Sequence, residues 1–441
     1  MVSPLSGRTA QGARPVVYLH VGAAKSGTTY LQQVLWHNRD RLREHGCLYP
    51  GTDLADHVRA AFDLRRAFFR GASDPSVPGA WRSLVERVRD WPGKAIISQE
   101  LFAPATASQV ARAMADLDFA DVHVVFTARD LARQIPAHWQ EDVKNRFSTP
   151  FAEFTAALRR TDWRSFDSAR LFWGLQDPVA VLRRWGAALP PERVHLVTLP
   201  RPGAPRDLLW QRFCTAVGLV PDEYDLSRSF ANPSLGLAES EFLLRLNAAL
   251  DDGVGWDVYN EIVKHYLAQQ VLTGRPAPAR IGLSPDDLRW ATERAIETAE
   301  GLRATGYDVV GDLYELVPAA GAGSVGAAPA GTAPAGASWA ELADVGTDAV
   351  AALLLRVLDT ERRGASTPGS EVAPRDRLDL LRDDSRELLE VTGRLAHDAT
   401  PLVHRAVHHA SERYPAVRRV RGAYRRLQDK TGRSDAGTNQ G

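Results

Sequence analysis

Short apolar runs alternate with amphipathic segments through the first 200 residues of the chain. After the first run, the apolar positions between 28 and 46 recur three and four residues apart, which predicts a helix that ends near Gly46. Strands alternating with helices favour an α/β fold with a parallel sheet. The apolar, β-branched runs that predict buried strands are 15–21, 94–98, 122–127 and 194–199.

The pattern changes in the second half of the chain. Residues 243–317 have mostly helical spacing, and Ser284-Pro285 has the form of a helix start. Residues 319–337 are almost entirely Ala, Gly, Pro, Ser and Thr, so we expect a flexible linker there. Ser338 and Glu341 have the spacing of a capping box before an apolar run. These features predict a main domain at 14–318, a linker at 319–337 and a helical C-terminal region at 338–441.

The C-terminal region continues with helical spacing at 375–395 and then with a basic, amphipathic tail. Residues 404–433 include nine cationic residues and only two acidic ones, and they also carry an apolar stripe. Such a helix binds an anionic membrane surface or an acidic protein, so residues 400–433 are a candidate for peripheral membrane or protein contact. The alternative is a solvated helix pair that packs its stripe on the rest of the protein.

Composition narrows the classes of function. The 441 residues carry 54 cationic and 54 acidic side chains, so no net field attracts nucleic acid, and 44% are hydrophobic, enough for a large core. Two cysteines, Cys47 and Cys214, are too few for a disulfide framework and lack zinc-site spacing, so we expect no metal. Residues 1–15 lack the apolar core of a signal peptide, which favours a cytoplasmic protein.

A glycine-rich loop at 22–29 (GAAKSGTT) joins the first predicted strand to the first predicted helix. A helix start of this kind presents free N–H groups and a positive dipole end to an anion. The order is not that of a Walker A loop, because Lys25 precedes Gly27 by two residues instead of following it. The alternative is a simple turn with a solvated lysine. The residues expected to hold a phosphate are Gly22, Lys25, Ser26, Gly27, Thr28 and Thr29.

The Lys-Ser-Gly-Thr-Thr order before an apolar helix resembles the 5'-phosphosulfate loop of bacterial P-loop sulfotransferases. The resemblance implies a three-layer α/β/α fold and the donor 3'-phosphoadenosine-5'-phosphosulfate (PAPS), with 3',5'-ADP as product and no metal. It implies sulfuryl transfer to a hydroxyl of a small-molecule, carbohydrate or lipid acceptor. If the basic tail binds lipid, the cytoplasmic enzyme would be peripheral to the inner membrane face. Lys25 would then neutralise the bridging oxygen as the sulfuryl group leaves.

Arg129 is the second candidate anchor. It follows the strand at 122–127, and the carboxyl ends of parallel strands lie on the ligand side of a sheet. The segment resembles the 3'-phosphate site of the sulfotransferases, which has a serine eight residues later where this chain has Ala137. Gln134, His138 or the loop at 232–234 are candidates for the missing donor. The alternative is an ordinary arginine paired with Asp130.

Three residues are candidates for the base that takes the acceptor proton. Glu100 ranks first, because it follows the strand at 94–98 where the sulfotransferases place a catalytic histidine or glutamate. His57, after the turn at 49–51, ranks second, and Glu44 on the first helix ranks third. A salt-bridged or capping carboxylate is the alternative for Glu100.

Two other functions stay open on the sequence. A P-loop kinase would use the same loop with ATP and magnesium, although the position of Lys25 disfavours it. A non-catalytic nucleotide-binding or scaffold protein would act through the tail, and Ala137 keeps that alternative open. The sequence carries no signature of the acceptor or of the oligomeric state.

Overall fold

The computed structural model describes residues 14–67, 74–227, 234–250, 254–275, 279–319 and 336–365. Most of the predicted linker lies outside these ranges, as do the segments at 375–395 and 400–433. In the described part of the chain, no helix is both long and apolar enough to cross a membrane.

Six strands form one parallel sheet in the order β2-β3-β1-β4-β5-β6. The four strands expected from apolar runs are all present, and β2 and β6 are additional. They have only two and three residues, too few to show a period in the sequence. The strands are β1 (Val16–His20), β2 (Cys47–Leu48), β3 (Lys94–Ser98), β4 (Asp121–Ala128), β5 (Val194–Thr198) and β6 (Asp308–Val310).

Contacts divide the chain into two compact units. Unit 1 holds the sheet and comprises residues 1–139, 151–232 and 282–327, and unit 2 comprises 140–150, 233–281 and 328–441. The helices of unit 1 are α1 (Thr28–His37), α2 (Arg39–Glu44), α3 (Ala55–Arg65), α4 (Ala80–Arg89), η1 (Glu100–Phe102), α5 (Ala107–Asp116), most of α6 (Leu131–Lys144), α7 (Phe151–Leu158), η2 (Trp163–Ser165), α8 (Asp167–Gln176), α9 (Pro178–Trp185), η3 (Pro191–Arg193), α10 (Leu208–Val217), η4 (Pro221–Glu223), α13 (Pro285–Arg303) and η7 (Leu313–Leu316).

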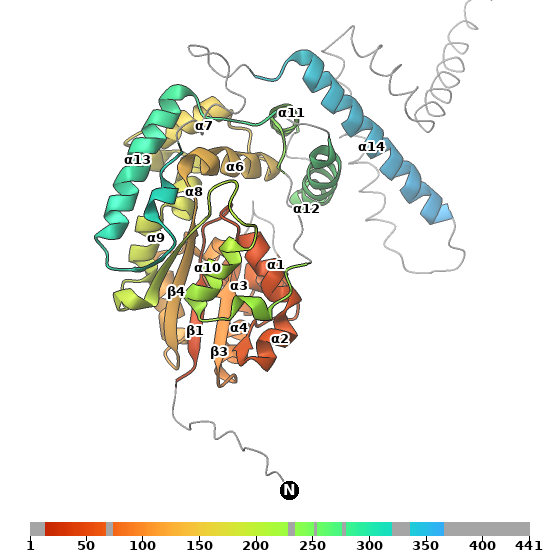
Figure 1. Cartoon of the computed structure of the whole chain (residues 1–441). Coiled ribbons are helices and arrows are strands. Elements are labelled where there is room, and N and C mark those ends of the chain that lie inside the picture. Colours follow the sequence, from red (N-terminus) through yellow and green to blue (C-terminus); the bar gives the residue numbers. More distant parts are fainter. Residues whose placement is uncertain are drawn as a thin grey trace, which may run out of the picture. The chain divides into compact units, whose positions relative to one another are not determined.

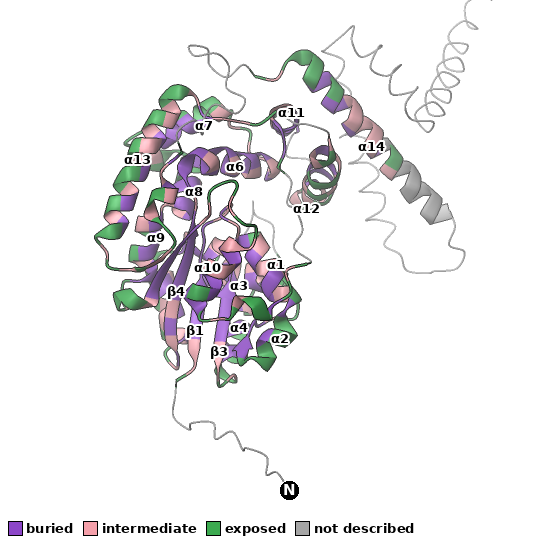
Figure 2. Ribbon diagram, viewed as in Figure 1, coloured by how far each residue is buried: buried purple, intermediate pink, exposed green. Residues whose placement is uncertain are grey.

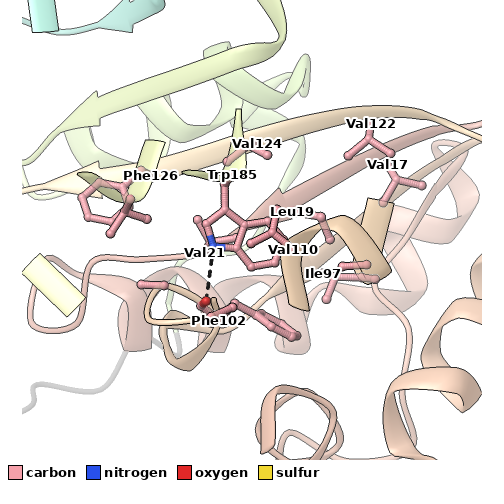
Figure 3. Close-up of a cluster of buried hydrophobic side chains, with 14 of the residues drawn as sticks. Val17, Leu19, Val21, Ile97, Phe102, Val110, Val122, Val124, Phe126 and Trp185 are labelled. Carbon is pink, nitrogen blue, oxygen red and sulfur yellow. Dashed lines mark hydrogen bonds between the residues drawn. The ribbon is translucent and has the colours of Figure 1, made fainter. Parts of the chain in front are cut away.

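Both faces of the sheet are covered, because successive strand residues point to opposite sides. Val17 and Leu19 of β1 and the following Val21 belong to one core, with residues of α3, α4, α5 and α9. Figure 3 shows this core, where the Trp185 indole donates to the Phe102 carbonyl at 3.2 Å. Tyr18, which lies between Val17 and Leu19 on β1, belongs to the core on the opposite face of the sheet, with residues of α1, α2 and α10.

The protein is therefore a three-layer α/β/α fold, as predicted (Figure 1). The strands are coloured mostly as buried in Figure 2, while exposed residues gather on the outer sides of the helices. Strands buried on both faces explain why they read in the sequence as continuous apolar runs instead of alternating ones.

Unit 2 is helical in its described residues. Its helix α14 packs on both α11 and η5. Arg275 holds α11 to α14, because its guanidinium lies 2.9 Å from Glu239 and 2.6 Å from Asp344. The predicted capping box of Ser338 and Glu341 is present at the start of α14. The bounds are α11 (Leu237–Ala249), α12 (Trp256–Val258), the π-helix η5 (Tyr259–Val271), η6 (Leu272–Gly274) and α14 (Trp339–Ala365).

The helical reading of 243–317 needs two refinements. The strand β6 lies inside that range and pairs with β5. Residues 233–281 also group with α14, whereas α13 and β6 group with the sheet. Whether 14–318 and 338–441 are independent domains stays a prediction.

Candidate functional site

The loop at 22–27 lies where the sheet reverses its order of strands. From β1 the chain builds β2 and β3 on one side, and it then crosses to build β4 and β5 on the other. Loops that leave neighbouring strands in opposite directions open a crevice at the carboxyl ends, which is where ligands bind in open α/β sheets. The ends of β1, β3 and β4 therefore define the candidate site.

Hydrogen bonds tie the loop to the end of β4. The Ala23 N–H donates to the Thr127 carbonyl at 2.7 Å, and the Thr127 N–H donates to the Gly22 carbonyl at 2.6 Å. The buried Ser26 hydroxyl donates to the Ala23 carbonyl at 2.6 Å and lies 2.5 Å from the Thr127 hydroxyl. The Ser26 side chain thus fixes the shape of the loop, and only its backbone is left to face an anion.

The backbone turns into α1 through two left-handed residues. Lys25 has φ 62° and Gly27 has φ 86°. The helix then begins at Thr28, and the Leu31 N–H makes the bond to the Gly27 carbonyl. The backbone N–H groups in the first turn of a helix have no acceptors within the helix. The N–H groups of Thr28, Thr29 and Tyr30 are therefore available to an anion in the crevice. Thr28 is buried and Thr29 is exposed.

Arg129 lies beside this loop. Its guanidinium donates to the Lys25 carbonyl at 3.0 Å, and its Nε is buried with no hydrogen-bond partner among the described residues. Burial and, to a smaller extent, the neighbouring Arg133 together lower the pKa of Arg129 to about 10. A cation held in this way is stabilised by an anion that binds next to it.

The expected alternative for Arg129, a pairing with Asp130, is not the arrangement observed. Asp130 pairs instead with Arg133, and its carboxylate accepts from the Arg133 backbone N–H at 3.0 Å. Asp130 therefore caps the start of α6 and neutralises the next arginine along. Arg129 has no carboxylate within salt-bridge distance in the described structure.

The substitutes proposed for the missing serine at Ala137 have other roles. Gln134 donates to the Ala24 carbonyl and, at 2.5 Å, to the Gln176 side chain. Gln176 in turn lies 3.1 Å from His138 Nδ1. Gln134 thus supports the loop from α6. Asn232 and Pro233 lie outside the described residues.

A small pocket opens next to Arg129 inside unit 1. Its wall includes Ala23 from the loop, Arg129, Trp173 and Gln176. Ala295 and Thr298 of α13 line it as well. The pocket joins the loop and the arginine into one site with both apolar and polar surface.

Glu100 stands at the end of β3, at the same edge of the sheet. Its Oε2 accepts a hydrogen bond from the Gln32 amide of α1 at 3.0 Å. No salt bridge to Glu100 is formed within the described ranges, so the salt-bridged alternative does not describe this carboxylate. The side chain is half-buried, so part of it is accessible to solvent.

Both ring nitrogens of His57 form hydrogen bonds with backbone groups. Its Nε2 lies 2.7 Å from the Pro50 carbonyl, which only accepts, and its Nδ1 accepts from the Ser98 N–H at 3.2 Å. The imidazole is therefore neutral, and burial lowers its pKa to about 4. With both ring nitrogens engaged, His57 anchors the end of β3, which favours Glu100 as the base. Glu44 is exposed at the end of α2.

A line of buried polar side chains connects the loop to Glu100. The Thr127 hydroxyl lies 3.4 Å from His20 Nε2, and His20 Nδ1 lies 2.8 Å from the Ser98 hydroxyl. Gln32 reaches the same hydroxyl at 3.4 Å and continues to Glu100. Burial lowers the pKa of His20 to about 4, so the line is neutral at pH 7.

Sequence reasoning missed Gln32, His20, Ser98 and Thr127. For His20, Ser98 and Thr127 the available signal was a polar residue near the end of an apolar run, because such residues meet at one edge of a parallel sheet. Within the described structure, no three His, Cys, Asp or Glu side chains are grouped so that they could hold a metal ion.

Comparisons with known proteins add little to this geometry. No protein-family model matches the chain, and no curated protein matches it. Among solved structures, the crystal structure of a sulfotransferase from Alicyclobacillus acidocaldarius aligns with 54% of this chain and 90% of its own. The identity is 17% and the TM-score is 0.31. A similarity of this size supports no conclusion about activity.

Proposed function

We propose that unit 1 transfers a sulfuryl group from PAPS to an acceptor hydroxyl. The observation that carries the proposal is the position of Arg129 beside the loop, with a buried Nε that lacks a partner among the described residues. The loop amides and Lys25 form one anion site, and Arg129 forms a second.

Two anion-binding groups in one site, the loop with Lys25 and the guanidinium of Arg129, favour a nucleotide whose phosphates are on different positions of the ribose. PAPS has this form, with a 5'-phosphosulfate and a 3'-phosphate. A nucleoside triphosphate carries all its charge on one chain, which would leave Arg129 without a phosphate. The residue order around Lys25 also disfavours the kinase function, because it is not the order of a Walker A loop.

The chemistry assigned to the chain is proton removal and charge stabilisation. When bound, PAPS supplies an activated sulfuryl group. The acceptor oxygen forms the new S–O bond as the bond to the bridging oxygen breaks, and the electron pair stays on 3',5'-ADP. Lys25 and the loop amides stabilise that charge, and Glu100 takes the hydroxyl proton.

Calorimetric titration tests the donor. We expect 3',5'-ADP to bind more tightly than 5'-AMP by about tenfold or more, because a charge-assisted hydrogen bond contributes roughly 1.5–3 kcal/mol. Arg129→Met removes this preference, whereas Arg41→Met, an exposed arginine on α2, keeps it. Tighter binding of Mg-ATP than of 3',5'-ADP would contradict the proposal and favour a kinase.

Transfer is tested separately with sulfur-labelled PAPS and a panel of sugars, phenols and lipids with free hydroxyls. We expect label to move to one class of acceptor, and Glu100→Gln to slow this about 100-fold or more while 3',5'-ADP still binds. Binding of 3',5'-ADP without transfer to any member of the panel favours the non-catalytic, nucleotide-binding alternative.

A further inference from the structure

Gln32 joins the two halves of the candidate site. It lies four residues after Thr28 on α1, so the two side chains share the face of the helix next to the loop. Its amide nitrogen donates to Glu100 Oε2 at 3.0 Å and lies 3.4 Å from both the Ser98 carbonyl and hydroxyl. One amide group therefore contacts the end of β3 and the candidate base together.

We propose that Gln32 is a positioning residue that orients the Glu100 carboxylate toward the acceptor hydroxyl, an inference that rests on the proposed sulfuryl transfer. The hydrogen bond occupies Oε2, so Oε1 is the oxygen that takes the proton. Gln32 touches neither the donor nor the acceptor and acts through Glu100.

The reason for placing this residue on α1 is geometric. The same helix supplies the amides of the loop at its first turn and Gln32 at its second. A rigid helix thus fixes the position of the carboxylate relative to the bound anion. Misplacement of a catalytic group by about 1 Å costs as much as 100-fold in rate, so a fixed distance matters.

The surroundings of Glu100 leave Gln32 as its main polar partner among the described residues. Burial, and to a smaller extent the nearby Glu100 carboxylate, raise the pKa of Tyr49 far above its usual range. His57 and His20 both contact Ser98 instead of the Glu100 carboxylate. Arg65 of α3 donates to the Leu101 carbonyl at 3.1 Å. Removing the Gln32 donor therefore takes away the hydrogen bond that orients the carboxylate.

The test compares Gln32→Leu with Gln33→Leu, the same change at the next position of α1, where the residue is also half-buried. The surroundings of the Glu100 carboxylate are read from its ¹³C chemical shift in glutamate-labelled protein, assigned as the signal that is absent from Glu100→Gln. The kcat and KM values are measured with sulfur-labelled PAPS and the acceptor that the panel identifies.

We expect Gln32→Leu to change the ¹³C signal of the Glu100 carboxylate and to lower kcat about tenfold at unchanged KM for PAPS. Gln33→Leu should leave both at wild-type values. An unchanged kcat in Gln32→Leu overturns the inference, even if wild-type protein transfers sulfuryl groups. Absence of 3',5'-ADP binding in wild-type protein instead overturns the proposed function, and the assignment of Gln32 with it.

Discussion

Lys25 is the residue at which charge and backbone can be separated. It has φ 62°, and alanine would adopt the same left-handed conformation at a similar cost. Lys25→Ala therefore removes the ammonium group with little change in the strain of the loop. We expect kcat to fall about 100-fold or more, because the charge that develops on the leaving nucleotide loses its main cation.

The unfolding temperature of Lys25→Ala should stay close to that of the wild type, as measured by calorimetry. Lys25→Arg serves as the control that keeps a positive charge at the same position, and it should recover part of the rate. Equal rates in Lys25→Ala and wild-type protein would show that the lysine takes no part in the reaction.

At this scale, the sequence allowed prediction of residues whose chemistry is unusual for their place. Lys25 stands in a glycine-rich loop, and Arg129 and Glu100 follow apolar strands. Gln32 gave no such signal, because a glutamine on an amphipathic helix is ordinary and its partner lies 68 residues away. The hydrogen bonds of the two His57 ring nitrogens could not be predicted either, because Pro50 and Ser98 come close to His57 only when the chain folds.

The junction of the loop with α1 depends on a glycine. A Cβ on Gly27 would lie 2.4 Å from Leu209 of α10, at a residue with φ 86°. We expect Gly27→Ala to destabilise the protein by about 1–3 kcal/mol and to abolish 3',5'-ADP binding, because both strain and the displaced leucine distort the loop.

Gly79 provides the matched control at the start of α4. It also has φ 86°, but a Cβ there would meet nothing within 4 Å. Gly79→Ala should lose only the roughly 1–2 kcal/mol of left-handed strain and keep nucleotide binding. Urea unfolding and calorimetry of both variants measure the difference. If the two variants lose the same stability and both bind 3',5'-ADP, the contact with Leu209 has no role.

Elements differed in how far the sequence predicts them. β3 has the predicted bounds, and α13 begins at the predicted cap, where Ser284 accepts from the Asp287 N–H at 3.1 Å. β2 and β6 exist only as additions to edges that β3 and β5 provide. Such strands form only by pairing with residues distant in sequence, so local periodicity does not predict them.

For the whole molecule, the sequence predicts the class of fold better than the grouping of its parts. Buried strands separated by helices predict a fold of three layers, with helices on both faces of one sheet, and the structure confirms it. The grouping of 233–281 with α14 depends on contacts such as those of Arg275 with Glu239 and Asp344. The predicted membrane or protein contact at 400–433 lies outside the described residues and stays a prediction.

Three histidines, two of them buried and one half-buried, make the stability of the whole fold depend on pH. Burial lowers the pKa values of His20, His57 and His123 to about 4, below the value of about 6.5 expected in the unfolded chain. Between pH 4 and 6.5 the unfolded state binds more protons, so the free energy of unfolding rises with pH there. The contribution of these histidines to the free energy of unfolding is fully present above about pH 6.5 and is lost as the pH falls toward 4.

The fully buried His57 alone should account for about 3 kcal/mol of this loss, since each pKa unit corresponds to about 1.4 kcal/mol. Urea unfolding at pH 7.5, 6.0 and 5.0 measures the slope. His57→Gln should flatten it, because glutamine keeps a donor for Pro50 and does not titrate. His265→Gln, at an exposed position, should leave the slope unchanged. Equal slopes in wild-type protein and His57→Gln would mean that His57 is not the neutral, buried anchor of β3, and it would then compete again with Glu100 as the base.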